Sequence, residues 1–152
     1  MSGPGNWTPP KQLPKGRSWA DMRAEFDLGV SVFTACWQAH IPRVAIENPA
    51  MNDLARAAMP DDLPAPQIVQ PHWFGEPAYK ATGWYLHGLP PLNATNRIPE
   101  PARDTADWKA WNRIHRMPPT PDRGRLRSRS FPGMMRAAAQ QWTDHALAQV
   151  AA

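Results

Sequence analysis

The chain has 152 residues, enough for one domain of ordinary size with its own hydrophobic core. Hydrophobic residues make up 42% and charged residues 20%, which excludes a disordered polar tail, and no apolar run approaches the roughly 20 residues of a bilayer span. The single cysteine, Cys36, excludes an internal disulfide framework and a metal cage built from cysteines, so we expect a cytoplasmic protein. The formal net charge of +4 gives a mild preference for polyanionic partners.

Proline and tryptophan are both frequent, with 19 and 8 residues. Proline at this level is typical of disorder, but disordered chains are poor in large aromatic residues, because those residues supply burial that offsets the entropy of ordering. Together the two residue types predict a compact domain of short elements joined by Pro-rich loops.

The first element is a helix that follows an irregular lead-in over residues 1–17. Ser18 stands at the N-cap position with Asp21 three residues later, an Asp version of the capping box. No proline occurs from residue 19 to 40, and Pro42 ends the segment. Apolar residues recur at helical spacing along it and predict one buried stripe: Met22, Phe26, Val30, Phe33 and Trp37.

Short strands and further helices follow. The run 44–46 precedes a polar turn and favours a buried parallel strand, while 67–70 and 82–86 predict two more strands. Residues 51–59 predict a short helix, 90–121 a long loop with about one helical turn at 108–114, and 131–150 the last helix. The expected inner face of that helix comprises Met134, Met135, Ala138, Trp142 and Leu147. The pattern predicts a single α/β domain over residues 18–152, with helices on a small mixed or parallel sheet.

The Glu47-Asn48 pair is the sharpest chemical feature. In open α/β sheets ligands bind beyond the carboxyl ends of the strands, and both residues fall at such an end. A carboxyl group there can exchange a proton with a nucleobase edge, and the Asn amide can donate and accept beside it. The alternative is that Glu47 caps the next helix and Asn48-Pro49 forms a turn.

Five segments occur in an order and at spacings that resemble the carboxyl-terminal half of the DNA cytosine-5 methyltransferase-like proteins of bacteriophages and prophages. They are I-P-R-V-A-I-E-N-P, Q-I-V-Q-P-H-W-F-G-E-P-A-Y-K-A-T, L-H-G-L-P-P-L, R-I-H-R-M-P-P-T-P-D-R and S-R-S-F-P-G-M-M-R-A-A-A-Q-Q-W. The resemblance covers residues from about 19 to 142. It implies the later half of a class I methyltransferase-like (Rossmann-like) sandwich in a bacterial host cell.

The resemblance also implies residue roles. Glu47-Asn48 matches the family's Glu-Asn-Val motif, whose glutamate holds the target cytosine during methylation, with Pro49 in place of the valine. Phe131 and Gly133 match a stretch that returns beside the S-adenosylmethionine pocket. The run 76–79, Glu-Pro-Ala-Tyr, departs from the His-Gly-Glu-Thr that family members more often carry.

Two family motifs have no counterpart in the sequence: the Gly-rich turn that receives the methyl donor, and the Pro-Cys motif whose cysteine attacks the base. Cys36 is not a substitute, because it lies within the predicted helix, where we expect it to be buried and inert. The missing half is therefore expected upstream: either a separate amino-terminal polypeptide supplies it, or the gene is a decayed prophage remnant. S-adenosylmethionine is expected to bind only when such a partner completes the pocket. The isolated chain should not methylate DNA.

A basic stretch follows the long loop. Arginines alternate with other residues near its end, and in an extended chain their guanidinium groups would share one side, suited to DNA phosphates. The candidate nucleic-acid-binding residues are Arg123, Arg125, Arg127 and Arg129. The alternative is a solvated loop whose arginines pair with acidic residues elsewhere.

The remaining polar and aromatic residues give weaker signals. The five histidines show no metal-ligand spacing, so no metal site is predicted. Trp73, Trp84 and Trp111 could stack on bases, but core packing is the preferred interpretation. The sequence therefore predicts a truncated or split cytosine methyltransferase-like protein, with a non-catalytic DNA-binding or protein-interaction module of the same ancestry as the alternative.

Overall fold

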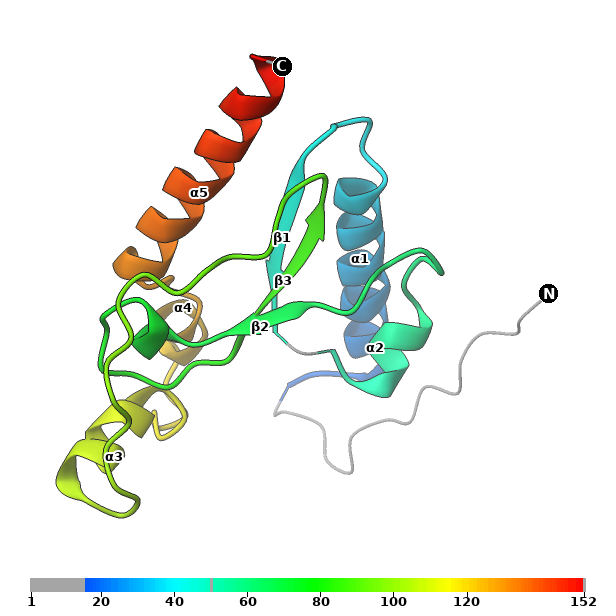
Figure 1. Ribbon diagram of the computed structural model, residues 1–152. Helices are drawn as coiled ribbons and strands as arrows, with labels where there is room; N and C mark the ends of the chain where they lie inside the picture. The colour runs from blue at the N-terminus through cyan, green and yellow to red at the C-terminus, as the bar shows by residue number, and fades with distance from the viewer. Residues whose placement is uncertain (1–15, 50, 152) are drawn as a thin grey trace.

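The computed structural model describes residues 16–49 and 51–151 (Figure 1). Helix α1 (Trp19–Trp37) begins with the predicted capping box: the Ser18 hydroxyl accepts from the Asp21 amide at 3.1 Å, and the Asp21 carboxylate accepts from the Ser18 amide at 2.9 Å. The helix ends three residues before the predicted end at residue 40. Most of the lead-in predicted over 1–17 lies outside the described residues.

The sheet has three strands, β1 (Val44–Asn48), β2 (Gln67–Val69) and β3 (Thr82–His87), in the order β1-β3-β2. β3 is antiparallel to both neighbours, so the prediction that 44–46 pairs in a parallel sheet is wrong. The segment between β2 and β3 contains only a one-turn 3-10 helix, η1 (Pro71–Trp73), and not the long helical crossover that a parallel connection needs. β1 and β2 run in the same direction, but the returning strand lies between them.

Helices α1 and α5 (Pro132–Val150) lie on opposite sides of this sheet (Figure 1). Successive residues of a strand point to opposite faces, so Trp84 and Tyr85 of β3 belong to different cores. The cluster on the α1 side comprises Phe33, Trp37, Leu63 and Tyr85. The cluster on the α5 side comprises Val69, Phe74, Trp84, Leu92, Met134, Ala137 and Ala138. The predicted combination of helices with a small sheet is confirmed.

The apolar stripe of α1 is buried only at its carboxyl-terminal end. Phe33 and Trp37 are buried, with the Phe33 ring edge-on to Tyr85 at 5.2 Å, whereas Met22, Phe26 and Val30 are half-buried. Cys36 is exposed on this helix, so the expectation that it is buried is wrong. The sheet is too short to cover a helix of 19 residues over its whole length.

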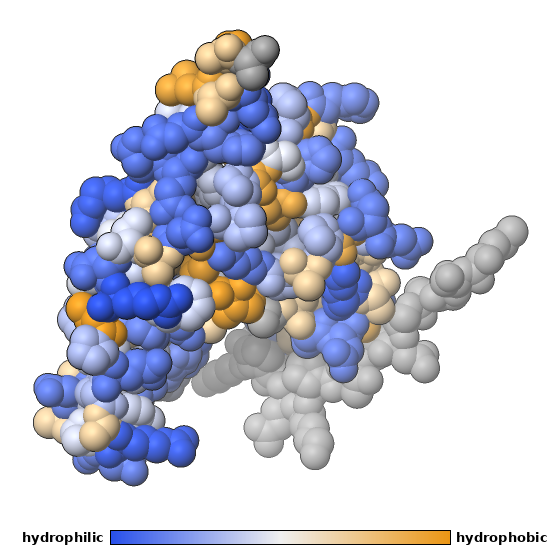
Figure 2. All heavy atoms as spheres, in the orientation of Figure 1, coloured by the Kyte–Doolittle hydropathy of each residue, from blue (hydrophilic) through white to orange (hydrophobic). Residues whose placement is uncertain are grey.

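The inner face of α5 is partly as predicted. Met134 and Ala138 are buried and Trp142 packs edge-on against Trp84 at 5.1 Å, but Met135 and Leu147 are exposed, so these two assignments are wrong. Met135 lies about 100° around the helix from Met134, and Leu147 lies about 180° around the helix from Ala138. Figure 2 shows apolar side chains gathered at the top of the molecule, over the carboxyl-terminal end of α5.

The remaining elements are short: α2 (Asp53–Ala57), α3 (Ala106–Trp111), the 3-10 helix η2 (Asn112–Ile114) and α4 (Arg123–Arg127). Trp84 and Trp111 are buried and Trp73 packs against the α5-side core, which confirms core packing for all three. Within the described residues, no helix is both long and apolar enough to cross a membrane.

Candidate nucleic-acid interface at the carboxyl end of the sheet

The carboxyl ends of β1 and β2 lie at the same end of the sheet, because both strands are antiparallel to β3. Asn48 stands opposite Gly83, and Val69 stands opposite Thr82, where β3 begins. Open parallel α/β sheets bind ligands at the carboxyl ends of their strands, but in this antiparallel sheet β3 ends at the opposite end, so that rule does not select this end.

Glu47 is the fourth residue of β1 and stands opposite Trp84, so its side chain lies on the α5 side of the sheet. It is exposed, and within the described residues its carboxylate has no hydrogen-bond or ion-pair partner. The next helix, α2, is capped by Asn52, whose Oδ1 accepts from the Ala55 amide at 2.8 Å. The alternative in which Glu47 caps this helix is therefore wrong.

Asn48 is half-buried at the last position of β1, and its backbone approaches β3 closely. A Cβ atom on Gly83 would lie 2.6 Å from the Asn48 carbonyl oxygen, so only glycine fits opposite this residue. The close approach fixes the backbone from which the Glu47 carboxylate projects.

Side chains after β2 and before β3 connect this end of the sheet to the basic stretch. Gln70 Oε1 accepts from the Lys80 amide at 3.1 Å, and Lys80 Nζ donates to the carbonyl of Arg129 at 3.1 Å. Sequence reasoning assigned no role to Gln70 or Lys80, because the contacts join residues up to 49 positions apart. The chain at Arg129 is thereby tied to the end of the sheet that carries Glu47.

The basic stretch is helical, so the prediction of an extended segment with its guanidinium groups on one side is wrong. Arg123, Arg125 and Arg127 lie in α4, where residues two positions apart point about 200° apart. An alternating pattern forms a strand only when it pairs with a neighbouring strand, and the described sheet consists of β1, β3 and β2 alone.

The four candidate arginines differ in their partners. Arg123 Nε donates to the carbonyl of Met117 at 3.0 Å, and Arg125 donates to the Asp122 carboxylate at 3.2 Å. Within the described residues, the guanidinium groups of Arg127 and Arg129 have no such partner. Of the four candidates, these two have guanidinium groups free to bind an anionic ligand.

Phe131 and Gly133 lie at the start of α5. Phe131 is partly buried against the α5-side core, and the Gly133 amide donates to Glu76 Oε1 at 3.0 Å. A Cβ on Gly133 would lie 2.3 Å from the carbonyl oxygen of Phe74. Glu76, which sequence reasoning missed as a contact, thus caps the helix across 57 positions.

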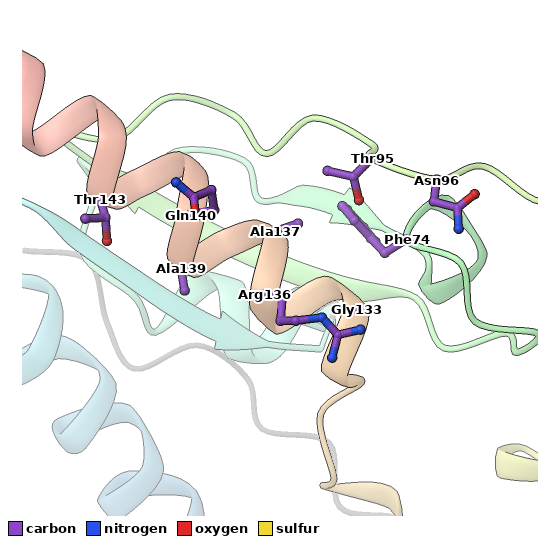
Figure 3. A pocket seen from close by; sticks show the side chains of 9 residues that line it. All are labelled: Phe74, Thr95, Asn96, Gly133, Arg136, Ala137, Ala139, Gln140 and Thr143. Carbon is purple, nitrogen blue, oxygen red and sulfur yellow. The ribbon is translucent and has the colours of Figure 1, made fainter.

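A groove of about 690 Å³ runs along α5 beside Gly133 (Figure 3). Its polar lining comprises Thr95, Asn96, Arg136, Gln140 and Thr143. S-adenosylmethionine carries a sulfonium and two ribose hydroxyl groups that favour a carboxylate partner, and this lining contains none. The groove therefore does not fit the methyl donor.

His72 belongs to a separate structural cluster. The His72 ring is buried, and its Nε2 is 3.4 Å from Glu100 Oε1. The Tyr79 hydroxyl donates a hydrogen bond to Glu100 Oε2 at 3.0 Å. Burial raises the pKa of Tyr79, and its hydrogen bond to Glu100 adds to the shift. The amide of Ile98 donates to the His72 carbonyl at 3.0 Å, so these contacts hold a long loop against η1. Over residues 16–49 and 51–151, no three His, Cys, Asp or Glu side chains come together as a metal site.

Comparisons with protein-family models, curated proteins and solved structures give no match for this chain. The geometry and the sequence pattern therefore carry the functional argument.

Proposed function

We propose that this chain is the DNA-contacting and base-holding part of a truncated or split cytosine-5 methyltransferase-like protein of phage or prophage type. The observation that carries the proposal is the position of Glu47: exposed, unpaired within the described residues, and at the end of the sheet that Lys80 ties to the Arg129 segment. A class I methyltransferase-like architecture for the complete protein is part of the same proposal.

Glu47 supplies the chemistry of base recognition. A cytosine presents a donor at its N4 amino group, which a glutamate oxygen accepts. A target base in a duplex must leave the stack before an enzyme can reach it, and a carboxyl group in an open position can receive an extruded base. Asn48, beside Glu47, supplies an amide that both donates and accepts.

Arg127 and Arg129 supply contacts to the phosphate backbone. A guanidinium binds phosphate through two parallel hydrogen bonds, which gives affinity without reading sequence. The nucleophile and the methyl donor would come from an amino-terminal half on a separate polypeptide, so the isolated chain binds DNA without methylating it.

Equilibrium binding to a duplex DNA of mixed sequence, measured across a salt series, tests the DNA contact. Two phosphate contacts predict a slope of log K against log salt of about −1.8. Replacing Arg127 and Arg129 with alanine should bring the slope close to zero. Arg125→Ala is the matched control, because Arg125 is already paired with Asp122 and should leave the slope unchanged. A slope that survives the double change would exclude this surface as the DNA site.

A non-catalytic DNA-binding module of methyltransferase ancestry is the second candidate. The observation that favours it is the groove beside Gly133, whose lining lacks the carboxylate that a methyl donor needs. Adding an amino-terminal methyltransferase half distinguishes the two candidate functions. A split enzyme gains methyl transfer activity, which Glu47→Gln should abolish, whereas a non-catalytic module gains no activity.

A further inference from the structure

The outer edge of β1 is open. Within the described residues β1 pairs with β3 alone, and the other edge of β3 is occupied by β2. Exposed edge strands usually carry a charge pattern, a proline or a bulge that prevents pairing with another chain. The central residues of β1, Val44, Ala45 and Ile46, are apolar on both faces and form a regular ladder with β3.

The two charged residues that flank this apolar core lie on the same face of the sheet. Arg43 donates from Nη2 to Gln149 of α5 at 2.8 Å, and Glu47 stands opposite Trp84, which packs on the α5 side. Ala45, between them, packs on the same cluster. Val44 and Ile46 therefore point to the α1 side, where Ile46 contacts the other core.

This pattern is complementary to itself when two copies pair antiparallel. A twofold axis at Ala45 places Arg43 opposite Glu47 of the second copy, and Glu47 opposite its Arg43. The same register places Val44 of each copy opposite Ile46 of the other copy, so two such apolar pairs form on the other face. Directly opposite side chains in an antiparallel pair have Cβ atoms about 5 Å apart, within reach of an ion pair.

Glu47 is exposed without a partner in the described part of the chain. Arg43 is half-buried: its Nη2 donates to Gln149 and its Nε is buried without a hydrogen-bond partner among the described residues, so Nη1 is the group left for a second copy. Shifting the register by two residues would set Glu47 opposite Ala45 and lose both ion pairs. The charges thus select one register among those that the backbone permits.

We propose that β1 is the contact strand of a twofold-symmetric homodimer in which two sheets join edge to edge. This goes beyond the proposed function and does not depend on it. In the dimer each Glu47 is engaged by Arg43 of the second copy, so dimerisation and base holding by Glu47 would exclude each other.

Sedimentation velocity of the full chain, from about 1 µM to about 500 µM, tests the proposal. The wild type should shift from monomer to dimer as concentration rises. Glu47→Arg replaces both ion pairs with like-charge pairs and should raise the dimer dissociation constant about 10- to 100-fold. The double variant R43E/E47R restores opposite charges in the same register and should regain most of the affinity. Asp61→Arg makes the same charge change at an exposed loop position and is the control.

A second measurement covers the case in which a change at Arg43 disturbs folding. Amide hydrogen exchange of the wild type should slow at residues 44–48 at the concentration that favours the dimer, and not at the outer edge of β2. A chain that stays monomeric over the whole concentration range overturns the proposal. A dimer whose affinity is unchanged by Glu47→Arg overturns it as well. Neither result depends on DNA binding or methyl transfer.

Discussion

Glu47 is the residue on which the functional interpretation depends, and its surroundings make a site role separable from a scaffold role. The side chain is exposed and has no partner within the described residues, so Glu47→Gln should change the free energy of unfolding by less than about 0.5 kcal/mol. For a chain of this size, that corresponds to a shift in Tm of about 2 °C or less. Thermal melts of the two proteins at dilute concentration measure it. A much larger drop would assign Glu47 to the scaffold.

Gly133 allows the first turn of α5 to lie against the carbonyl of Phe74. Gly133→Ala would place a Cβ 2.3 Å from that oxygen, which belongs to the backbone and cannot rotate away. We expect a loss of about 1–3 kcal/mol in unfolding free energy, as for other overpacked sites. Gly29→Ala on α1 is the matched control, because its Cβ would have open space and should stabilise the helix by up to about 1 kcal/mol. Urea unfolding of both variants measures the contrast; equal effects would contradict the close contact.

At the scale of elements, the start of α1 depends on the reciprocal cap between Ser18 and Asp21. Ser18→Ala should cost about 0.5–2 kcal/mol, because the Asp21 amide loses its acceptor. The hydrogen bonds from the Ser18 amide and hydroxyl lower the pKa of Asp21. This contribution is complete above the unfolded pKa of about 3.9 and is lost as the pH falls through the lower folded value. Thermal melts of the wild type should therefore show a loss of stability between neutral pH and pH 3 that includes the Asp21 contribution. Asp21→Asn has no carboxylate at this position, so its stability should lack this contribution at every pH.

The sequence predicted an element correctly where several local signals indicated the same structure. The cap, the apolar spacing and the following proline all indicate one helix, and α1 is found there. The run 44–46 identified a strand but not its direction, because three apolar residues carry no information about which strand lies beside them. The alternating arginines resembled a strand by the same logic, yet without a neighbouring strand they form α4.

The parts of the candidate site that sequence reasoning missed are contacts over long distances in the chain. Glu76 caps α5, and Lys80 donates a hydrogen bond to the Arg129 carbonyl. The residues next to Glu76 and Lys80 in the sequence do not indicate which distant residue either one contacts. Glu47 could be singled out because its signal is local: a carboxylate directly after an apolar run. Its exposure and its lack of a partner within the described residues had to come from the fold.

At the scale of the whole molecule, the groove along α5 beside Gly133 has no carboxylate in its lining. We expect isothermal titration of S-adenosylmethionine into the chain to give no binding at micromolar concentrations. The reason is the absence of both a Gly-rich turn in the sequence and a carboxylate in the groove. Micromolar affinity for the chain alone would contradict this account of the groove.

The central position of β3 has a consequence for how the molecule opens. Its two neighbours occupy both of its edges, and its alternate side chains enter the two separate cores through Trp84 and Tyr85. Detaching α1 exposes one core and detaching α5 exposes the other, but neither event frees the backbone amides of β3. Native-state exchange should therefore show two partial openings of lower free energy, with the amides of residues 82–87 released last, close to the free energy of global unfolding.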